Sequence, residues 1–183
     1  MLYIMRHGRT DWNDRKKLQG RTDIPLNETG REMAKKAAVE YADVNFDVCF
    51  CSPLVRALET AEIFLKNRDV PINTDERLVE MGFGDYEGFE NSFQIPDCPV
   101  NVLFKEPEKY ITPVAGGESF EDLFKRTGSF LREVIEPLLE QGKDILIIGH
   151  GAMNSSIVCQ VKNIPIEQFW SAGIENCKLM KLM

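Results

Sequence analysis

The sequence predicts an α/β protein with three layers, α/β/α, a mostly parallel central sheet and a small inserted cap. Two short apolar segments, residues 2–5 and 144–149, are continuous rather than alternating, which is typical of strands buried on both faces. Helical patterns separate the strand-like segments, and this alternation favours a sheet covered by helices on both sides. A chain of 183 residues fits a single domain, residues 1–183, with one hydrophobic core.

Each predicted strand is a short apolar segment between polar or turn-forming residues. The predicted strands, in chain order, are residues 2–5, 47–51, 71–75, 144–149 and 176–183.

The first two predicted helices have recognisable start signals. Asn27 can cap a helix over residues 28–42. Ser52, followed by Pro53, supplies a cap and a first-turn proline for a helix over residues 53–67.

Two further helices are predicted in the second half of the chain. One begins near Ser119 and ends at Gly142, with a kink expected at Pro137. The other follows Gly151 and runs to Lys162, where an Asn-Ile-Pro sequence stops it.

Residues 89–117 interrupt this alternation. The segment has four prolines and no clear strand pattern, so we expect an inserted cap or lid rather than a second domain. Its aromatic side chains could line an apolar pocket or pack the cap against the body. These residues are Phe89, Phe93, Phe104 and Tyr110.

The composition excludes several classes of protein. A net charge of −7 argues against a nucleic-acid partner, which requires an excess of lysine and arginine on one face. No apolar stretch approaches the length of about 20 residues that crosses a bilayer, so we expect a cytoplasmic protein with no membrane partner. The five cysteines form no C-x-x-C pair and are expected to be buried free thiols.

The chain has only two histidines, and each directly follows one of the two buried strand segments. Ligands collect at the carboxyl ends of parallel strands, so we expect His7 and His150 to meet at one solvent-accessible hollow. Arg6 precedes His7, and Arg56 lies about one helical turn beyond Ser52. Guanidinium groups suit phosphate oxygens, and neighbouring positive charge lowers the pKa of an imidazole, which leaves it unprotonated and nucleophilic.

Structural interpretations of the same residues stay open at this point. Arg56 could form a surface ion pair with Glu59 or Glu62 on its own helix. His150 could be a half-buried core residue at the start of a helix.

A series of motifs along the chain resembles, in order, that of the histidine phosphatase superfamily, which includes cofactor-dependent phosphoglycerate mutases. The resemblance covers nearly the whole chain, with residues 89–115 as the main region outside it. The motifs are RHGRTDWN, LQGRTDIPLNETG, CSPLVRALETA, LVEMGFGDYEG, GGES and IIGHG.

The resemblance implies a role for each matching residue. His7 would become phosphorylated, Arg6, Arg56 and His150 would hold the phosphoryl oxygens, and Glu80 would give a proton to the leaving oxygen. From the residues alone, the choice of proton donor among Glu80, Asp85 and Glu87 stays open. Further substrate or phosphate contacts are implied for Thr10, Asn13, Gln19, Gly20 and Gly151.

Two places depart from the pattern of the family. Arg9 occupies a position that is often acidic, and it could enlarge the cationic pocket or face solvent. After His150 the family often has a glycine pair and then an arginine, whereas this chain has Ala152, Asn154 and Ser155. The second departure concerns the choice of substrate and not the phosphoryl centre.

The sequence therefore predicts a phosphatase that hydrolyses a small phosphorylated metabolite through a phosphohistidine on His7. We expect no metal and no cofactor, because the chain offers a poor set of metal ligands and the arginines can stabilise the phosphoryl group. A mutase is the first alternative, although the chain is shorter than the mutases it resembles. A non-catalytic binder of phosphorylated ligands is the second.

Overall fold

The computed structural model describes residues 1–111 and 113–183, so Thr112, which falls inside the predicted cap, lies outside the described residues. One five-stranded sheet has the strand order β3-β2-β4-β1-β5. All neighbouring pairs are parallel except β1 and β5, which confirms the mostly parallel sheet. The strands are β1 (Leu2–Arg6), β2 (Val48–Cys51), β3 (Ile72–Thr74), β4 (Ile145–Gly149) and β5 (Leu179–Lys181).

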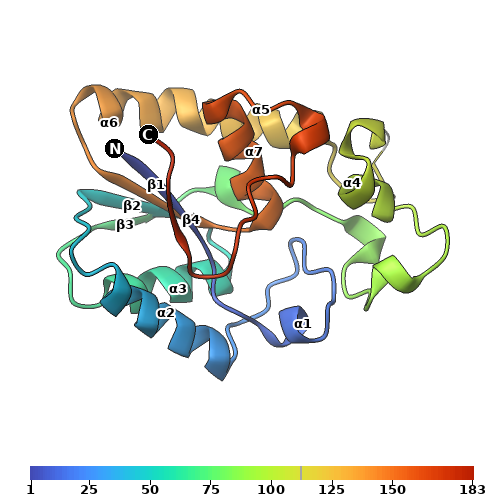
Figure 1. Cartoon of the computed structure of the whole chain (residues 1–183), viewed down its shortest axis with the longest axis horizontal. Coiled ribbons are helices and arrows are strands. Elements are labelled where there is room, and N and C mark those ends of the chain that lie inside the picture. Colours follow the sequence, from blue (N-terminus) through green and yellow to red (C-terminus); the bar gives the residue numbers. More distant parts are fainter. Residues whose placement is uncertain (112) are drawn as a thin grey trace.

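Helices cover both faces of the sheet (Figure 1), as the alternation predicts. In this view α2 (Glu28–Glu40) and α3 (Val55–Leu65) lie below the sheet, and the α5–α7 layer lies above it. The upper layer comprises α5 (Phe120–Phe130), a π-helical turn (Leu131–Ile135), α6 (Glu136–Glu140) and α7 (Gly151–Lys162).

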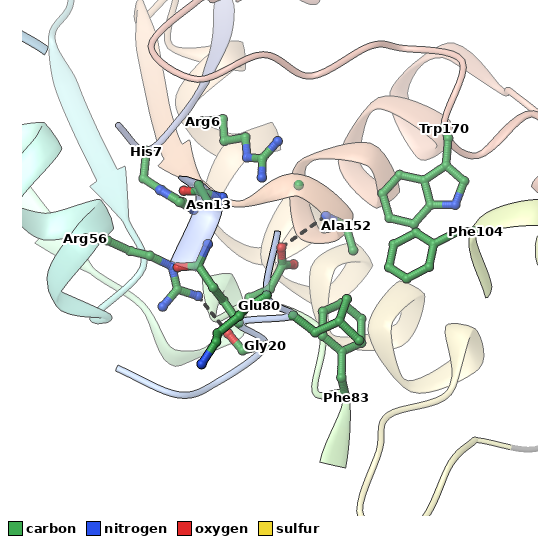
Figure 2. A pocket seen from close by; sticks show the side chains of 14 residues that line it. Arg6, His7, Asn13, Gly20, Arg56, Glu80, Phe83, Phe104, Ala152 and Trp170 are labelled. Carbon is green, nitrogen blue, oxygen red and sulfur yellow. Dashed lines mark hydrogen bonds between the residues drawn. The ribbon is translucent and has the colours of Figure 1, made fainter. Parts of the chain in front are cut away.

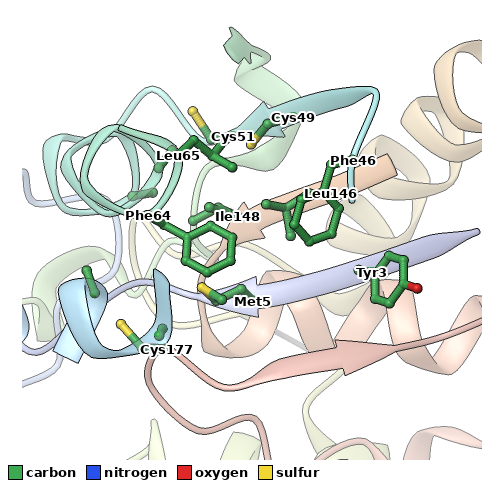
Figure 3. Packing of buried hydrophobic residues seen from close by; sticks show 14 residues of the cluster. Tyr3, Met5, Phe46, Cys49, Cys51, Phe64, Leu65, Leu146, Ile148 and Cys177 are labelled. Atoms are coloured by element: carbon green, nitrogen blue, oxygen red, sulfur yellow. The ribbon is translucent and has the colours of Figure 1, made fainter. Parts of the chain in front are cut away.

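The central strands are buried on both faces because their side chains alternate between two cores. Tyr3 and Met5 of β1 pack with Phe64 of α3 on one face (Figure 3). Leu2 and Ile4 pack with the α5–α7 layer on the other face. Every residue of β4 is buried, which explains why its sequence shows no polar alternation.

The register of β1 against β4 sets the position of both histidines. Leu2 lies opposite Ile145, and Arg6 lies opposite Gly149, so the two parallel strands end side by side. The backbone N–H of His7 donates to the carbonyl of Gly149 at 2.9 Å, which extends the pairing by one residue.

The prediction that Ser52 caps the second helix is wrong. α3 begins at Val55, and its N-cap is Leu54, which makes no side-chain capping bond. The backbone N–H of Ser52 still donates to Ile148 of β4 at 3.1 Å, so Ser52 continues the sheet. Its hydroxyl accepts the N–H of Leu54 at 3.3 Å and shapes the turn that leads into the helix.

The helix predicted from Ser119 to Gly142 is interrupted near its proline. Ser119 caps α5 as predicted, because its hydroxyl accepts the N–H of Asp122 at 3.0 Å. The π-helical turn at Leu131–Ile135 comes directly before Pro137. Proline has no N–H to donate to the carbonyl four residues earlier, and a wider turn accommodates that loss.

The described part of the 89–117 segment contains a short α-helix, α4 (Asn101–Lys105), which the sequence pattern does not predict. In Figure 1 this helix lies beside the α5–α7 layer. A second short helix outside the predicted set, α1 (Asp11–Asp14), lies near the carboxyl end of β1 (Figure 1). Leu103 of α4 is fully buried in a core cluster that also contains Phe120 and Phe169.

Two further expectations concern the cysteines and membrane-spanning helices. All five cysteines are buried free thiols, as predicted. Within residues 1–111 and 113–183, no helix combines the length and the apolar character needed to span a bilayer.

Replacing Phe130 tests the core that supports the upper helix layer. Phe130 is fully buried, with its ring 5.6 Å from that of Phe50 and 5.3 Å from the guanidinium of Arg77. Phe130→Ala should lower the free energy of unfolding by about 3–5 kcal/mol, because it leaves a cavity between helix and sheet. Val39 is exposed and serves as the control. Val39→Ala should change the free energy of unfolding by less than about 0.5 kcal/mol. Urea denaturation measures both values, and an equal loss of stability in the two variants would contradict the packing of Phe130.

Candidate active site

The two histidines lie together at the carboxyl ends of β1 and β4. Their ring centroids are 5.2 Å apart, with an angle of 59° between the ring planes. His7 lines a cavity of about 230 Å³, while His150 is fully buried and does not line it. The expectation that both imidazoles open onto the hollow is therefore met by His7 alone.

Arg56 is buried beside both histidines and holds the neighbouring loop. Its Nε donates to Nδ1 of His150 at 3.2 Å, and its two terminal nitrogens donate to the carbonyls of Gly20 (2.7 Å) and Thr22 (2.9 Å). Figure 2 shows the guanidinium reaching toward Gly20 on the His7 side of the cavity. The interpretation of Arg56 as a surface ion pair is wrong, because the side chain has no exposed surface.

Arg6 ends β1 and lines the cavity next to His7. One terminal nitrogen donates to the carbonyl of Ile174 at 3.2 Å. Its Nε, like Nε2 of His150, is buried and has no hydrogen-bond partner among the described residues. Leaving a buried polar atom unpaired costs free energy, so these two nitrogens mark places where ligand oxygens would be stabilised.

Burial and positive charge keep both imidazoles neutral. Burial lowers the pKa of His7 well below its usual value, and Arg56 and Arg6 lower it further, against a smaller opposite effect of the Gly8 carbonyl. Burial also lowers the pKa of His150 well below its usual value, followed by the charges of Arg56, His7 and Arg6. Burial lowers the pKa of Arg56 to about 10, so this guanidinium stays charged at neutral pH.

The hydrogen bonds of the two rings assign opposite tautomers. Nδ1 of His7 lies 2.6 Å from the carbonyl of Gly8, which can only accept, so we place the proton on Nδ1 and a lone pair on Nε2. Nδ1 of His150 accepts from Arg56, so the proton of His150 sits on Nε2. One ring thus offers a nucleophilic nitrogen and the other an N–H donor.

Glu80, Asp85 and Glu87, the three candidates for the proton donor, have different surroundings in the structure. Glu80 lines the cavity and accepts backbone N–H groups of Met81 (2.8 Å) and Met153 (3.0 Å). Glu87 accepts the N–H and hydroxyl of Thr22 and the N–H groups of two other residues, so it holds loops together. Asp85 is exposed and lies outside the cavity wall.

Four of the five predicted contact residues line the same cavity, namely Asn13, Gln19, Gly20 and Gly151. Thr10 lies behind this wall, where its hydroxyl donates to the side-chain carbonyl of Gln19 at 2.9 Å. Thr10 therefore supports the wall rather than facing the cavity.

Arg9 and the residues after His150, which depart from the family pattern, lie in different places relative to the cavity. Arg9 points away from the cavity, because its guanidinium pairs with Asp14 at 2.7 Å and is partly exposed. Ala152 lines the cavity. Asn154 is buried below it and donates to the carbonyl of Met5 at 3.0 Å, and Ser155 is also buried.

Several wall residues escaped sequence reasoning, because distant segments meet there. Of the four aromatic residues proposed from the 89–117 segment, only Phe104 lines the cavity. Tyr110 is buried with its hydroxyl accepting the N–H of Val114. Lys17, Leu18, Phe83 and Trp170 complete the wall. Leu18 and Phe83 lie within the quoted motifs without a role assigned to them, and Lys17 and Trp170 lie outside those motifs.

Comparisons with known proteins agree with this geometry. The sequence model of the histidine phosphatase superfamily (branch 1) matches residues 2–183. A 2,3-bisphosphoglycerate-dependent phosphoglycerate mutase from Cytophaga hutchinsonii is 31% identical over 169 residues, covering 91% of this chain and 79% of the relative.

Two solved structures share the fold over most of their length. Bacillus stearothermophilus YhfR has a TM-score of 0.82 at 34% identity, covering 93% of this chain and 83% of that one. Mycobacterial glucosyl-3-phosphoglycerate phosphatase Rv2419c has a TM-score of 0.84 at 27% identity, covering 97% of this chain and 90% of that one.

The lowered pKa values predict how stability depends on pH. The unfolded chain protonates its histidines near pH 6.5, while the folded chain does so only at lower pH. The neutral histidines therefore contribute fully to stability above pH 6.5. Below pH 6.5, each histidine should lower the free energy of unfolding by about 1.4 kcal/mol per pH unit, until the pH reaches its pKa in the folded protein. The double variant His7→Asn/His150→Gln should lose less stability than wild type between pH 7.5 and 5.5 in urea denaturation.

An NMR titration checks the same shift directly. The two imidazole signals of the folded protein should stay in their neutral positions while a denatured sample titrates near pH 6.5. Titration of both folded signals near pH 6.5 would rule out the shifts.

Proposed function

The chain belongs to the histidine phosphatase superfamily (branch 1), and from that premise we propose that it is a phosphomonoesterase acting on a small phosphorylated metabolite. The observation that carries the proposal is the neutral His7, whose unprotonated nitrogen lines a cavity that also presents Arg6 and Arg56. The chain as a whole has a charge of −7, yet two guanidinium groups and an ammonium, that of Lys17, line this cavity. Such a local cationic pocket attracts a phosphate ester.

The first step transfers the phosphoryl group to the enzyme. Nε2 of His7 attacks phosphorus, the phosphorus–oxygen bond to the alcohol breaks, and the Glu80 carboxylic acid donates its proton to the departing oxygen. Arg6 and Arg56, which line the cavity, would bind two of the peripheral oxygens. The buried Nε2–H of His150, which has no partner among the described residues, would donate to the third from behind the wall. The charge of these oxygens is redistributed in the transition state.

The second step restores the enzyme. Water attacks the phosphohistidine, the Glu80 carboxylate takes up a proton from that water, and the bond between phosphorus and His7 breaks. The sum of the two steps consumes one ester and one water and yields one alcohol and one inorganic phosphate. These side chains supply the charge and the protons for both steps, so the proposal includes no metal and no cofactor.

Phosphoryl transfer to a second hydroxyl, as in a mutase, is the alternative that the Cytophaga relative favours. We favour hydrolysis because a phosphoglycerate also has a carboxylate to be bound. Beyond Arg6 and Arg56, the described cavity wall offers that carboxylate only Lys17. A non-catalytic binder is the third candidate, and the pairing of neutral His7 with Glu80 in one cavity argues against it.

Phosphate release from a panel of phosphorylated metabolites tests the proposed reaction. Wild type should release phosphate from at least one ester without added metal. His7→Asn, which removes the nucleophile, should lower kcat by about 10³-fold or more. Glu80→Gln should lower it by about 10²- to 10⁴-fold, because the amide cannot donate the proton. Asp85→Asn is the matched control and should retain the wild-type rate, since Asp85 lies outside the cavity.

Each other outcome points to one of the alternatives. Conversion of 3-phosphoglycerate to 2-phosphoglycerate without net phosphate release would identify a mutase. Binding of esters with neither hydrolysis nor transfer would identify the binder.

Thr60 is predicted to position His7 through the backbone. Its hydroxyl accepts the N–H of Gly8 at 3.0 Å and donates to the carbonyl of Arg56 at 2.7 Å, and the Gly8 carbonyl in turn fixes the His7 ring. Thr60→Val should lower kcat by about tenfold to a hundredfold with little change in KM. Thr60→Ser, which keeps the hydroxyl, should restore most of the rate. Equal rates for the two variants would show that the hydroxyl does not position His7.

A further inference from the structure

We propose that the alcohol half of the substrate carries a flat, uncharged ring, which binds to an aromatic wall beyond Glu80. The inference rests on the proposed phosphatase function, because it concerns the leaving group in the same cavity. The aromatic wall consists of Phe83, Phe104 and Trp170, which come from three separate parts of the chain.

The aromatic wall lies on the side of the cavity away from the phosphoryl-binding groups. In Figure 2, Glu80 and Ala152 lie between the side that holds His7 and Arg56 and the side that holds the aromatic rings. A proton donor to the leaving oxygen belongs at the junction of phosphoryl group and alcohol. The alcohol would therefore extend past Glu80 toward the rings.

The rings of the wall are already arranged for stacking. Phe104 and Trp170 stack with their centroids 5.3 Å apart and their planes 28° apart, and Phe83 lies 6.0 Å from Phe104. Such surfaces favour the face or edge of a further flat ring. A linear aliphatic chain would also bury apolar area against the aromatic wall, but it would not gain the additional energy of stacked or edge-to-face ring contacts.

Contacts behind the wall hold the rings in place. The indole N–H of Trp170 donates to the carbonyl of Leu103 at 2.9 Å, which fixes α4 against the body. The ring of the buried Phe169 meets that of Trp170 edge to face at 4.8 Å. A surface arranged before binding loses little side-chain entropy when a ligand arrives, so its contacts contribute more fully to affinity. In this proposal the 89–117 segment acts as the cap over the alcohol half.

The charges around the cavity disfavour an anionic leaving group. Arg56 and Arg6 lie on the phosphoryl side of the cavity next to His7, where the phosphoryl oxygens would bind them. Lys17 is the remaining cation in the described wall, and its ammonium lies 5.4 Å from the centre of the Trp12 ring. A carboxylate on the alcohol would thus find no free guanidinium fork in the described wall beside it.

The volume of the cavity limits the size of the substrate. At about 230 Å³ it is smaller than pockets for drug-sized ligands, which start near 300 Å³. A phosphomonoester of a short alcohol that bears a single ring system fits a cavity of this size.

Binding of phosphonates tests the inference independently of catalysis, because their carbon–phosphorus bond is not hydrolysed. Calorimetry should show 3-phenylpropylphosphonate binding about tenfold or more tightly than propylphosphonate. The anionic analogue 2-carboxyethylphosphonate should bind more weakly than the phenyl compound. Phe104→Leu and Trp170→Leu, which remove one ring each, should reduce the ratio of phenyl to propyl affinity severalfold. Phe89→Leu is the matched control, since Phe89 is exposed outside the cavity and should leave that ratio unchanged.

Hydrolysis of the matching esters separates this inference from the proposed function. 3-Phenylpropyl and propyl phosphate have leaving groups of similar acidity, so their kcat/KM ratio reports binding of the ring and should also be about tenfold. Hydrolysis of both esters at equal kcat/KM, with equal phosphonate affinities, would overturn the aromatic wall and leave the phosphatase standing. Tighter binding of the carboxylate analogue would likewise overturn it. If neither these esters nor any ester of the metabolite panel is hydrolysed, the phosphatase proposal fails. The ratio of phenyl to propyl phosphonate affinity still decides for or against the aromatic wall.

Discussion

The parallel pairing of β1 with β4 is the constraint on which the site depends. Because Arg6 lies opposite Gly149, the residues that follow the two strands emerge side by side at the same edge of the sheet. Both strands are buried on both faces, so a slip of register would move apolar side chains out of two cores at once. The fold thereby holds two imidazoles, distant in sequence, 5.2 Å apart.

The same environment gives the two rings different chemistry. The Gly8 carbonyl orients His7 so that its unprotonated nitrogen is available, whereas Arg56 forces the opposite tautomer on His150. Burial and the nearby guanidinium groups keep both rings neutral. Among the described residues, Nε of Arg6 and Nε2 of His150 are buried without a hydrogen-bond partner, and oxygens of a bound phosphoryl group would supply one.

The parts of the structure that local patterns determine could be predicted from the sequence, and the parts made by distant contacts could not. Continuous apolar runs identified β1 and β4, and Asn27 and Ser119 cap their helices as expected. The predicted cap at Ser52 was wrong because the backbone N–H of Ser52 still bonds to Ile148 of β4, which no local sequence signal shows. The role of Glu87 depends on loops that meet only in the fold, and Trp170 joins the cavity wall through packing of the 89–117 segment.

Identification of the phosphorylated residue shows whether His7 is the nucleophile. The enzyme is mixed with a hydrolysed ester, quenched in alkali within the first turnovers to preserve acid-labile phosphate, digested and examined by mass spectrometry. We expect phosphate on the peptide that contains His7, and none on that peptide in a His7→Asn sample. Phosphate on His150, or continued hydrolysis without any phosphorylated histidine, would contradict that expectation.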